Sequence, residues 1–152
     1  MEDFVKISKI FQTQPINSII LVRLIVGAVF LSEGIQKFLF PETLGIGRFI
    51  NIGIPVPEFF APFDGVFEVL CGTLIIIGFF TKLASIPMII NMIVAISTTK
   101  IPILLNDGFW KMAHEARTDW SMLLGLIFLL IVGSGKLSID YIIFKNMNSK
   151  KE

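Results

Sequence analysis

The sequence predicts an all-α integral membrane protein, a bundle of four transmembrane helices. Of its 152 residues, 54% are hydrophobic and 16% are charged. A soluble domain usually has about 45–50% apolar and about 25% charged residues. The mean hydropathy is +0.80. The apolar residues gather in four segments, each near the roughly 20 residues that a helix needs to cross ~30 Å of hydrocarbon.

The first predicted span begins at a proline, which suits the first turn of a helix, and the second also begins at a proline. The third begins at Thr81, an N-cap candidate, directly after the second, so these two helices form a tight antiparallel hairpin. The fourth begins at a Thr-Asp pair, again capping residues. The predicted spans cover residues 15–38, 57–80, 81–99 and 118–133.

The two longer connections, residues 39–56 and 100–117, are each predicted to hold a short interfacial helix. In the first, the apolar stretch Leu44–Ile52 is closed by Gly53 and two prolines. The second is amphipathic and carries Trp110, a residue type that favours the lipid headgroup zone.

The distribution of basic residues predicts the orientation. Four spans place both termini on one side of the membrane. The termini and the tight turn between the second and third spans carry seven Lys residues, against five Lys and Arg residues on the other side. The positive-inside rule therefore favours cytoplasmic termini in the cell (inner) membrane. The start of the chain lacks the pattern of a signal peptide. The expected organisation is a cytoplasmic segment 1–14, a transmembrane domain 15–142 and a polar tail 143–152.

Five ionisable residues lie inside the predicted spans: Arg23, Glu33, Lys37, Asp64 and Glu68. In the centre of a bilayer each costs roughly 2.5–3.5 kcal/mol on insertion scales, so such groups face one another, a water-filled cavity or a ligand. These five residues are therefore the best pointers to function in the sequence.

Depth along the helices predicts an ion pair between Arg23 and Glu68. Arg23 lies about 12 Å from the inner end of the first span, and Glu68 lies about 16 Å from the outer end of the second. In a slab of ~30 Å these heights nearly coincide. Asn91 in the third span reaches the same layer. The alternative to a functional pair is a structural one that locks the two helices together.

The remaining ionisable residues gather towards the outer end of the predicted bundle. Glu33 and Lys37 are spaced i,i+4 in the favourable order, although near a membrane boundary they could equally extend to water. Asp64 and Glu68 share that spacing but carry like charges, so they need a neighbouring cation or a retained proton. We expect a polar funnel that is completed by residues before the fourth span: His114, Glu115, Arg117 and Asp119.

Several classes of site are not expected. His114 is the only histidine, so no metal site is predicted, and Cys71 is expected to be a packing residue. The sequence holds neither a dinucleotide-binding fingerprint nor a phosphate-binding loop. A net charge of +1 gives no indication of a nucleic-acid partner.

The order and spacing of short stretches across residues 18–142 carry a family resemblance. These stretches are Arg23–Gly27, Glu33–Lys37, Gly53–Pro57, Glu68 with Gly72 and Gly78, Thr81–Ala84, His114–Asp119 and Gly133–Asp140. Together they resemble the DoxX family of small four-helix membrane proteins, with Lys82 and Lys136 where arginine is more usual. The resemblance implies a membrane subunit related to thiosulfate:quinone oxidoreductase, to quinone or catechol detoxification, or to complexes that manage thiol and oxidative stress.

Two classes of function are therefore open. In the first, a quinone is the substrate of a membrane subunit without a covalently bound cofactor. Arg23 or Lys37 bonds the quinone carbonyls, Asp64 and Glu68 relay protons, and a soluble redox partner supplies electrons. In the second, the chain is a non-catalytic transporter or scaffold for a small anion, a sulfur species or a soluble partner. An anion route would use Arg23 and Lys37 as attracting charges and would require a homodimer.

Overall fold

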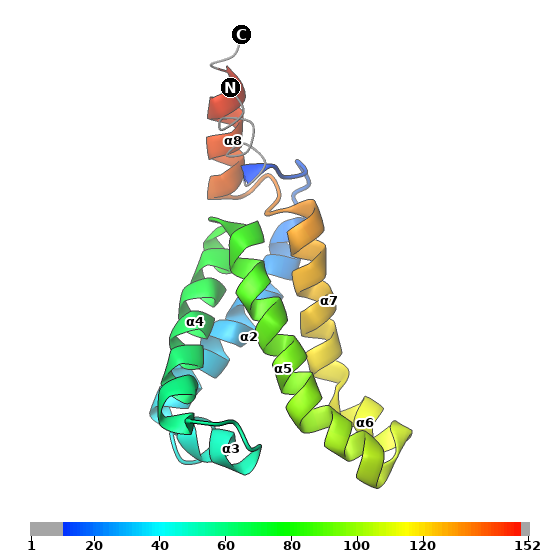
Figure 1. Ribbon diagram of the computed structural model, residues 1–152. Helices are drawn as coiled ribbons and strands as arrows, with labels where there is room; N and C mark the ends of the chain where they lie inside the picture. The colour runs from blue at the N-terminus through cyan, green and yellow to red at the C-terminus, as the bar shows by residue number, and fades with distance from the viewer. Residues whose placement is uncertain (1–10, 150–152) are drawn as a thin grey trace.

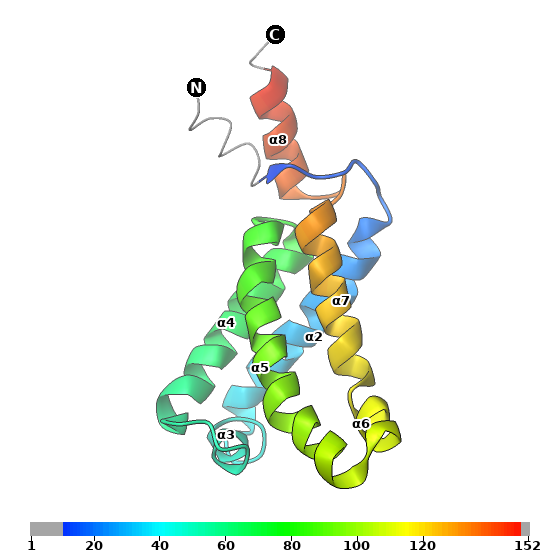
Figure 2. The same ribbon diagram turned by 45° about the vertical axis from the view of Figure 1, so that its right-hand side comes forward.

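The computed structural model describes residues 11–149, which form helices and turns without a strand in that range. The helices of this range are α2 (Ile19–Leu39), α3 (Ile46–Asn51), α4 (Pro57–Ile77), α5 (Thr81–Asp107), α6 (Phe109–Glu115), α7 (Arg117–Val132) and α8 (Ile139–Ser149). Helices α2, α4, α5 and α7 contact one another, and we call this group of helices the bundle. The short helices α3 and α6 lie at one end of it and α8 at the other (Figures 1 and 2).

Among residues 11–149, three helices are long and apolar enough to cross a membrane: α2 and α4 with 21 residues each, and α5 with 27. By length and composition they confirm three of the four predicted spans. The fourth predicted span corresponds to α7, which has 16 residues and is therefore about 24 Å long. That is short of the ~30 Å hydrocarbon core, so a crossing by α7 stays a prediction.

The helix bounds differ most from the prediction at two places. Helix α2 begins at Ile19 rather than at Pro15. Helix α5 does not end at residue 99 but continues to Asp107. The Thr98 and Thr99 hydroxyls donate to the carbonyls of Val94 and Ala95, at 2.8 and 2.6 Å. These polar residues are thus accommodated within the helix instead of ending it.

The predicted connections do contain helices, α3 within residues 39–56 and α6 within residues 100–117. Their place at the membrane surface stays a prediction. The predicted segment 1–14 falls mostly outside the described residues. Helix α8 crosses the boundary predicted at residue 142, because it runs on to Ser149.

Glycines set the close approach of α2 and α4. A Cβ atom on Gly34 would lie 2.7 Å from the carbonyl oxygen of Gly65, and one on Gly72 would lie 2.7 Å from the amide nitrogen of Leu31. The backbones of the two helices are therefore in direct contact, the packing that small residues allow in membranes. This contact fixes the spacing of side chains that project from both helices.

Candidate ligand-binding pocket

A cavity of about 590 Å³ lies between α2, α3, α4, α5 and α7. Its volume falls within the ~300–1,000 Å³ of typical small-molecule sites. Much of the wall is apolar and includes Phe30, Phe49, Phe63, Met92 and Met122. The charged residues of the wall come from all five helices: Glu33, Lys37, Arg48, Asp64, Glu68, Lys100 and Asp119.

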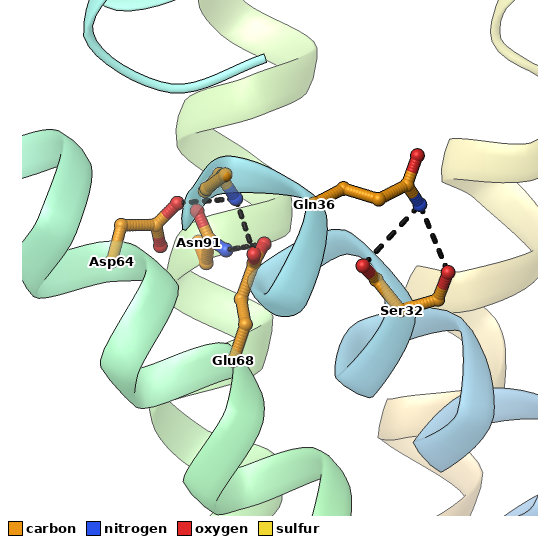
Figure 3. Close-up of polar contacts among 6 residues, drawn as sticks. Ser32, Gln36, Asp64, Glu68 and Asn91 are labelled. Carbon is orange, nitrogen blue, oxygen red and sulfur yellow. Dashed lines mark hydrogen bonds and ion pairs between the residues drawn. The ribbon is translucent and has the colours of Figure 1, made fainter. Parts of the chain in front are cut away.

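The polar centre of the pocket is built on Lys37. Its ammonium group lies 2.8 Å from Oδ2 of Asp64 and also donates to Oε2 of Glu68. Asn91 Nδ2 donates to the other carboxylate oxygen, Oε1 of Glu68, at 2.9 Å. Figure 3 shows Asp64 and Glu68 of α4 and Asn91 of α5 turned towards one another. We call Lys37, Asp64, Glu68 and Asn91 the polar cluster.

The polar cluster explains how α4 holds two carboxylates one turn apart. Lys37 from α2 supplies the cation that this spacing requires. The side chains of Lys37, Asp64 and Glu68 are only 10%, 17% and 6% exposed, so the charges are partly compensated inside the bundle. The i,i+4 partner expected for Lys37, Glu33, is not the one it uses. Lys37 crosses to α4, and Glu33 lies on the pocket wall.

A second ion pair closes the wall between α5 and α7. Lys100 Nζ lies 3.4 Å from Oδ2 of Asp119, and both side chains are largely shielded from solvent. Arg48 of α3 lines the same pocket. Lys100 and Arg48 were not among the site residues predicted from the sequence. At 100° per residue Thr98 lies on the same face of α5 as Asn91, whereas Lys100 lies on the opposite side of the helix, so helical spacing gave no signal for Lys100.

The predicted pair of Arg23 and Glu68 is wrong. Arg23 is buried and donates to four backbone carbonyls. These are Ile75 O at 2.9 Å, Ser134 O at 3.0 Å, Leu137 O at 2.6 Å and Ile76 O. It lies outside the pocket wall. Because α2 begins at Ile19, Arg23 is only ~6 Å into its helix. Its long side chain extends to the last turn of α4, away from Glu68.

The remaining predicted residues divide at the start of α7. Asp119 lines the pocket, whereas His114, Glu115 and Arg117 do not. All three of these are exposed, and Arg117 donates to the carbonyl of His114 at 2.8 Å. Cys71 is buried in the hydrophobic core. Within residues 11–149 no group of three metal-ligating side chains comes together.

Comparison with known proteins shows to which family the chain belongs. The model of the DoxX family matches residues 18–101, more than half of the chain. The chain belongs to the DoxX family. The matched region of this DoxX protein contains α2, α3, α4 and most of α5, so all four residues of the polar cluster lie within it.

Two relatives of this DoxX protein cover most of its length. An uncharacterised membrane protein of Mycobacterium tuberculosis is 56% identical over 129 residues, which are 81% of this chain and 79% of the relative. A protein of Bacillus subtilis, provisionally named oxidoreductase CatD, is 31% identical over 128 residues, 83% of this chain and 87% of the relative. No solved structure matches. This DoxX protein is therefore a membrane protein with a distant relative named as an oxidoreductase.

Proposed function

We propose that this DoxX protein is the membrane subunit of a quinone-linked redox or detoxification system. The observation that carries the proposal is a pocket of about 590 Å³ with the polar cluster in its otherwise largely apolar wall. A quinone headgroup is a flat apolar ring with two carbonyl acceptors. It needs apolar walls, a few hydrogen-bond donors and groups that can supply protons. The name of the Bacillus subtilis relative supports the same class of reaction.

The polar cluster keeps donors free for a carbonyl oxygen. A lysine ammonium has three N–H donors, and the contacts to Asp64 and Glu68 use two of those of Lys37. An asparagine amide has two N–H donors, and Glu68 accepts one from Asn91. One donor on each side chain is left for a bound quinone. An ammonium group at this position would also stabilise negative charge that develops on the quinone oxygen.

Reduction of a quinone requires a source of protons and a source of electrons. A quinone takes up two electrons and two protons to become a hydroquinone. In this proposal Asp64 and Glu68 pass protons to the ring oxygens, and a soluble redox partner that oxidises thiol or sulfur compounds supplies the electrons. In this proposal the α3 end of the bundle faces outward, and both termini are cytoplasmic in the inner membrane.

The alternative, a route for a small anion, receives no support from these contacts. It relied on Arg23 and Lys37 as attracting charges. Arg23 donates to backbone carbonyls outside the pocket, and Lys37 is paired with two carboxylates. With four carboxylates against three basic residues on its wall, the pocket has no excess positive charge for an anion.

Quinone binding to purified protein in lipid nanodiscs tests the proposal. We expect a soluble benzoquinone to bind the parent protein and Lys37→Met to weaken binding about tenfold, the effect of one lost charged hydrogen bond of ~1.5 kcal/mol. Lys111→Met is the matched control, because Lys111 is exposed and outside the pocket. Absence of binding to the parent protein would overturn the proposal.

The proton role needs a separate variant. In membranes where the variant replaces the native chain, Glu68→Gln is expected to abolish quinone-dependent turnover, because the amide keeps the shape and loses the acid. Glu115→Gln, exposed and outside the pocket, is expected to leave turnover unchanged. Full turnover in Glu68→Gln would refute the role of Glu68.

A further inference from the structure

One side of the pocket lies between α4 and α5. The residues that line it there are apolar and exposed: Phe60 and Phe63 on α4 are 40% and 48% exposed, and Ile90 and Val94 on α5 are 58% and 44% exposed. We call these four residues the portal. Both of its helices are membrane-spanning candidates, so exposed side chains on them face lipid acyl chains rather than water.

The paths of the two helices explain why the pocket opens there. Helices α4 and α5 are joined by the short turn of residues 78–80 and lie close together at that end. They diverge towards the end that holds α3 and α6, as both views show (Figures 1 and 2). Phe63 and Val94 lie on the diverging parts and line the pocket between them.

Three of the four portal residues lie at a depth where the bilayer consists of hydrocarbon. Ile90, Val94 and Phe63 are respectively about 14, 20 and 21 Å along their helices from the α4–α5 turn. In a hydrocarbon core of ~30 Å these positions fall between the centre and the far boundary. Glu68 and Asn91 lie about 14 and 15 Å from the same turn. The polar cluster and the lipid-facing portal are therefore nearly level, and a ring held by Lys37 has the bilayer directly beside it.

The rest of the pocket wall indicates which part of a ligand lies where. The charged residues Arg48, Lys100 and Asp119 surround the pocket from α3, α5 and α7, whereas the portal residues carry no polar side-chain atom. A ligand with a polar ring and a long apolar chain matches this division. The ring contacts the polar cluster, and the chain leaves through the portal without passing charged groups.

We propose that the pocket takes its ligand sideways from the bilayer, between α4 and α5, and that this ligand is a quinone with a long apolar tail rather than a water-soluble quinone. The inference rests on the proposed function and narrows its substrate class. Phe63, Ile90 and Val94 border the opening through which the tail leaves, and none of them has a polar side-chain group that could contact the reacting ring oxygens.

The test compares two probes with the same benzoquinone headgroup, one with a long alkyl chain and one without. Affinities in nanodiscs are expressed per concentration in the membrane, so that partitioning alone does not favour the tailed probe. On this scale the two probes are expected to bind within about threefold of each other, because a tail that leaves through the portal stays in hydrocarbon and gains no further apolar burial. Per total concentration the tailed probe is expected to bind about tenfold or more tightly, because its tail concentrates it in the bilayer beside the portal. A tailed probe that binds about tenfold or more weakly than the tail-less probe on the membrane scale would overturn the inference, since a pocket closed to the bilayer excludes the tail, and would leave the proposed function standing.

Substitutions at the portal test the route itself. Val94→Trp is expected to slow association of the tailed probe about tenfold or more while association of the tail-less probe changes less than about twofold. Ile93→Trp is the matched control, because Ile93 is also lipid-exposed, at 52%, and lies on the same helix but does not line the pocket. Equal slowing of both probes by Val94→Trp, or equal effects of Val94→Trp and Ile93→Trp, would contradict lateral access.

A second variant acts in the opposite direction and does not depend on tolerance of a large side chain. Phe63→Ala widens the portal, and the tailed probe is expected to associate faster while the tail-less probe is unaffected. An unchanged rate for the tailed probe in Phe63→Ala would count against the portal. Failure of both probes to bind the parent protein would overturn the proposed function together with this inference.

Discussion

Arg23 and Asp140 hold the two sides of the same turn. The Arg23 guanidinium donates to the carbonyls of Ile75 and Ile76 at the end of α4. The Asp140 carboxylate accepts the amide N–H groups of Phe80 and Thr81, at 2.8 and 3.0 Å, where α5 begins. The two residues are far apart in the sequence and come from α2 and α8. Together they satisfy backbone groups that a helix end leaves without partners.

Replacement of Arg23 should destabilise the protein strongly. Arg23→Met removes a charged donor from four backbone carbonyls, of which the contacts to Ile75 and Ser134 are buried. We expect the free energy of unfolding in detergent micelles to fall by about 2–4 kcal/mol, since a charged hydrogen bond contributes ~1.5–3 kcal/mol. Arg48→Met, at an exposed arginine, should change it by less than about 0.5 kcal/mol. Equal stability of the two variants would contradict the structural role of Arg23.

Asp140 should act as a cap for α5. Asp140→Ala removes both acceptors for the first amide groups of that helix, and we expect a loss of about 1–2 kcal/mol in the free energy of unfolding. Asp140→Asn keeps one acceptor oxygen and should lose less. The exposed Asp107, paired with Lys111, provides the control Asp107→Ala. Equal destabilisation of Asp140→Asn and Asp140→Ala would show that capping of α5 is not how Asp140 stabilises the protein.

Lys37 and Glu68 should be energetically coupled. Lys37→Met leaves Asp64 and Glu68 one turn apart without their shared cation, so this variant should be clearly less stable than the parent protein. Adding Glu68→Gln removes one of the two carboxylates and should restore part of the loss. Thermal unfolding of the two single variants and the double variant gives the coupling energy, which we expect to exceed about 1 kcal/mol. If the stability change of the double variant equals the sum of the two single changes, the contact between Lys37 and Glu68 contributes no coupling energy.

Gly72 should not tolerate a methyl group. A Cβ atom there would lie 2.7 Å from Leu31 N and 2.9 Å from Gly27 O, both backbone atoms. Gly72→Ala must therefore push α2 away from α4, and we expect a loss of about 1–3 kcal/mol. Ala28→Val, on the exposed face of α2, is the control for added volume. Because Lys37 and Glu68 sit on these two helices, Gly72→Ala should also weaken quinone binding, which the nanodisc assay measures.

The sequence determined the helical membrane class, three spans and most of the polar cluster. Long apolar segments fix helices of spanning length, because backbone groups in hydrocarbon must bond within their own segment. The cost of ionisable groups in such segments singled out Lys37, Asp64 and Glu68, and helical rise placed Asn91 near Glu68, where the structure has it.

Only the tertiary structure decided which charges meet. Arg23 and Lys37 both lie on α2, and distance along a helix could not show that Arg23 extends to the end of α4 while Lys37 reaches across to Asp64 and Glu68. Long basic side chains extend over more than a helical turn, so their partners depend on how closely the helices pack and where each helix begins. The divergence of α4 from α5 towards the end that holds α3 and α6 is likewise visible only in the tertiary structure (Figures 1 and 2).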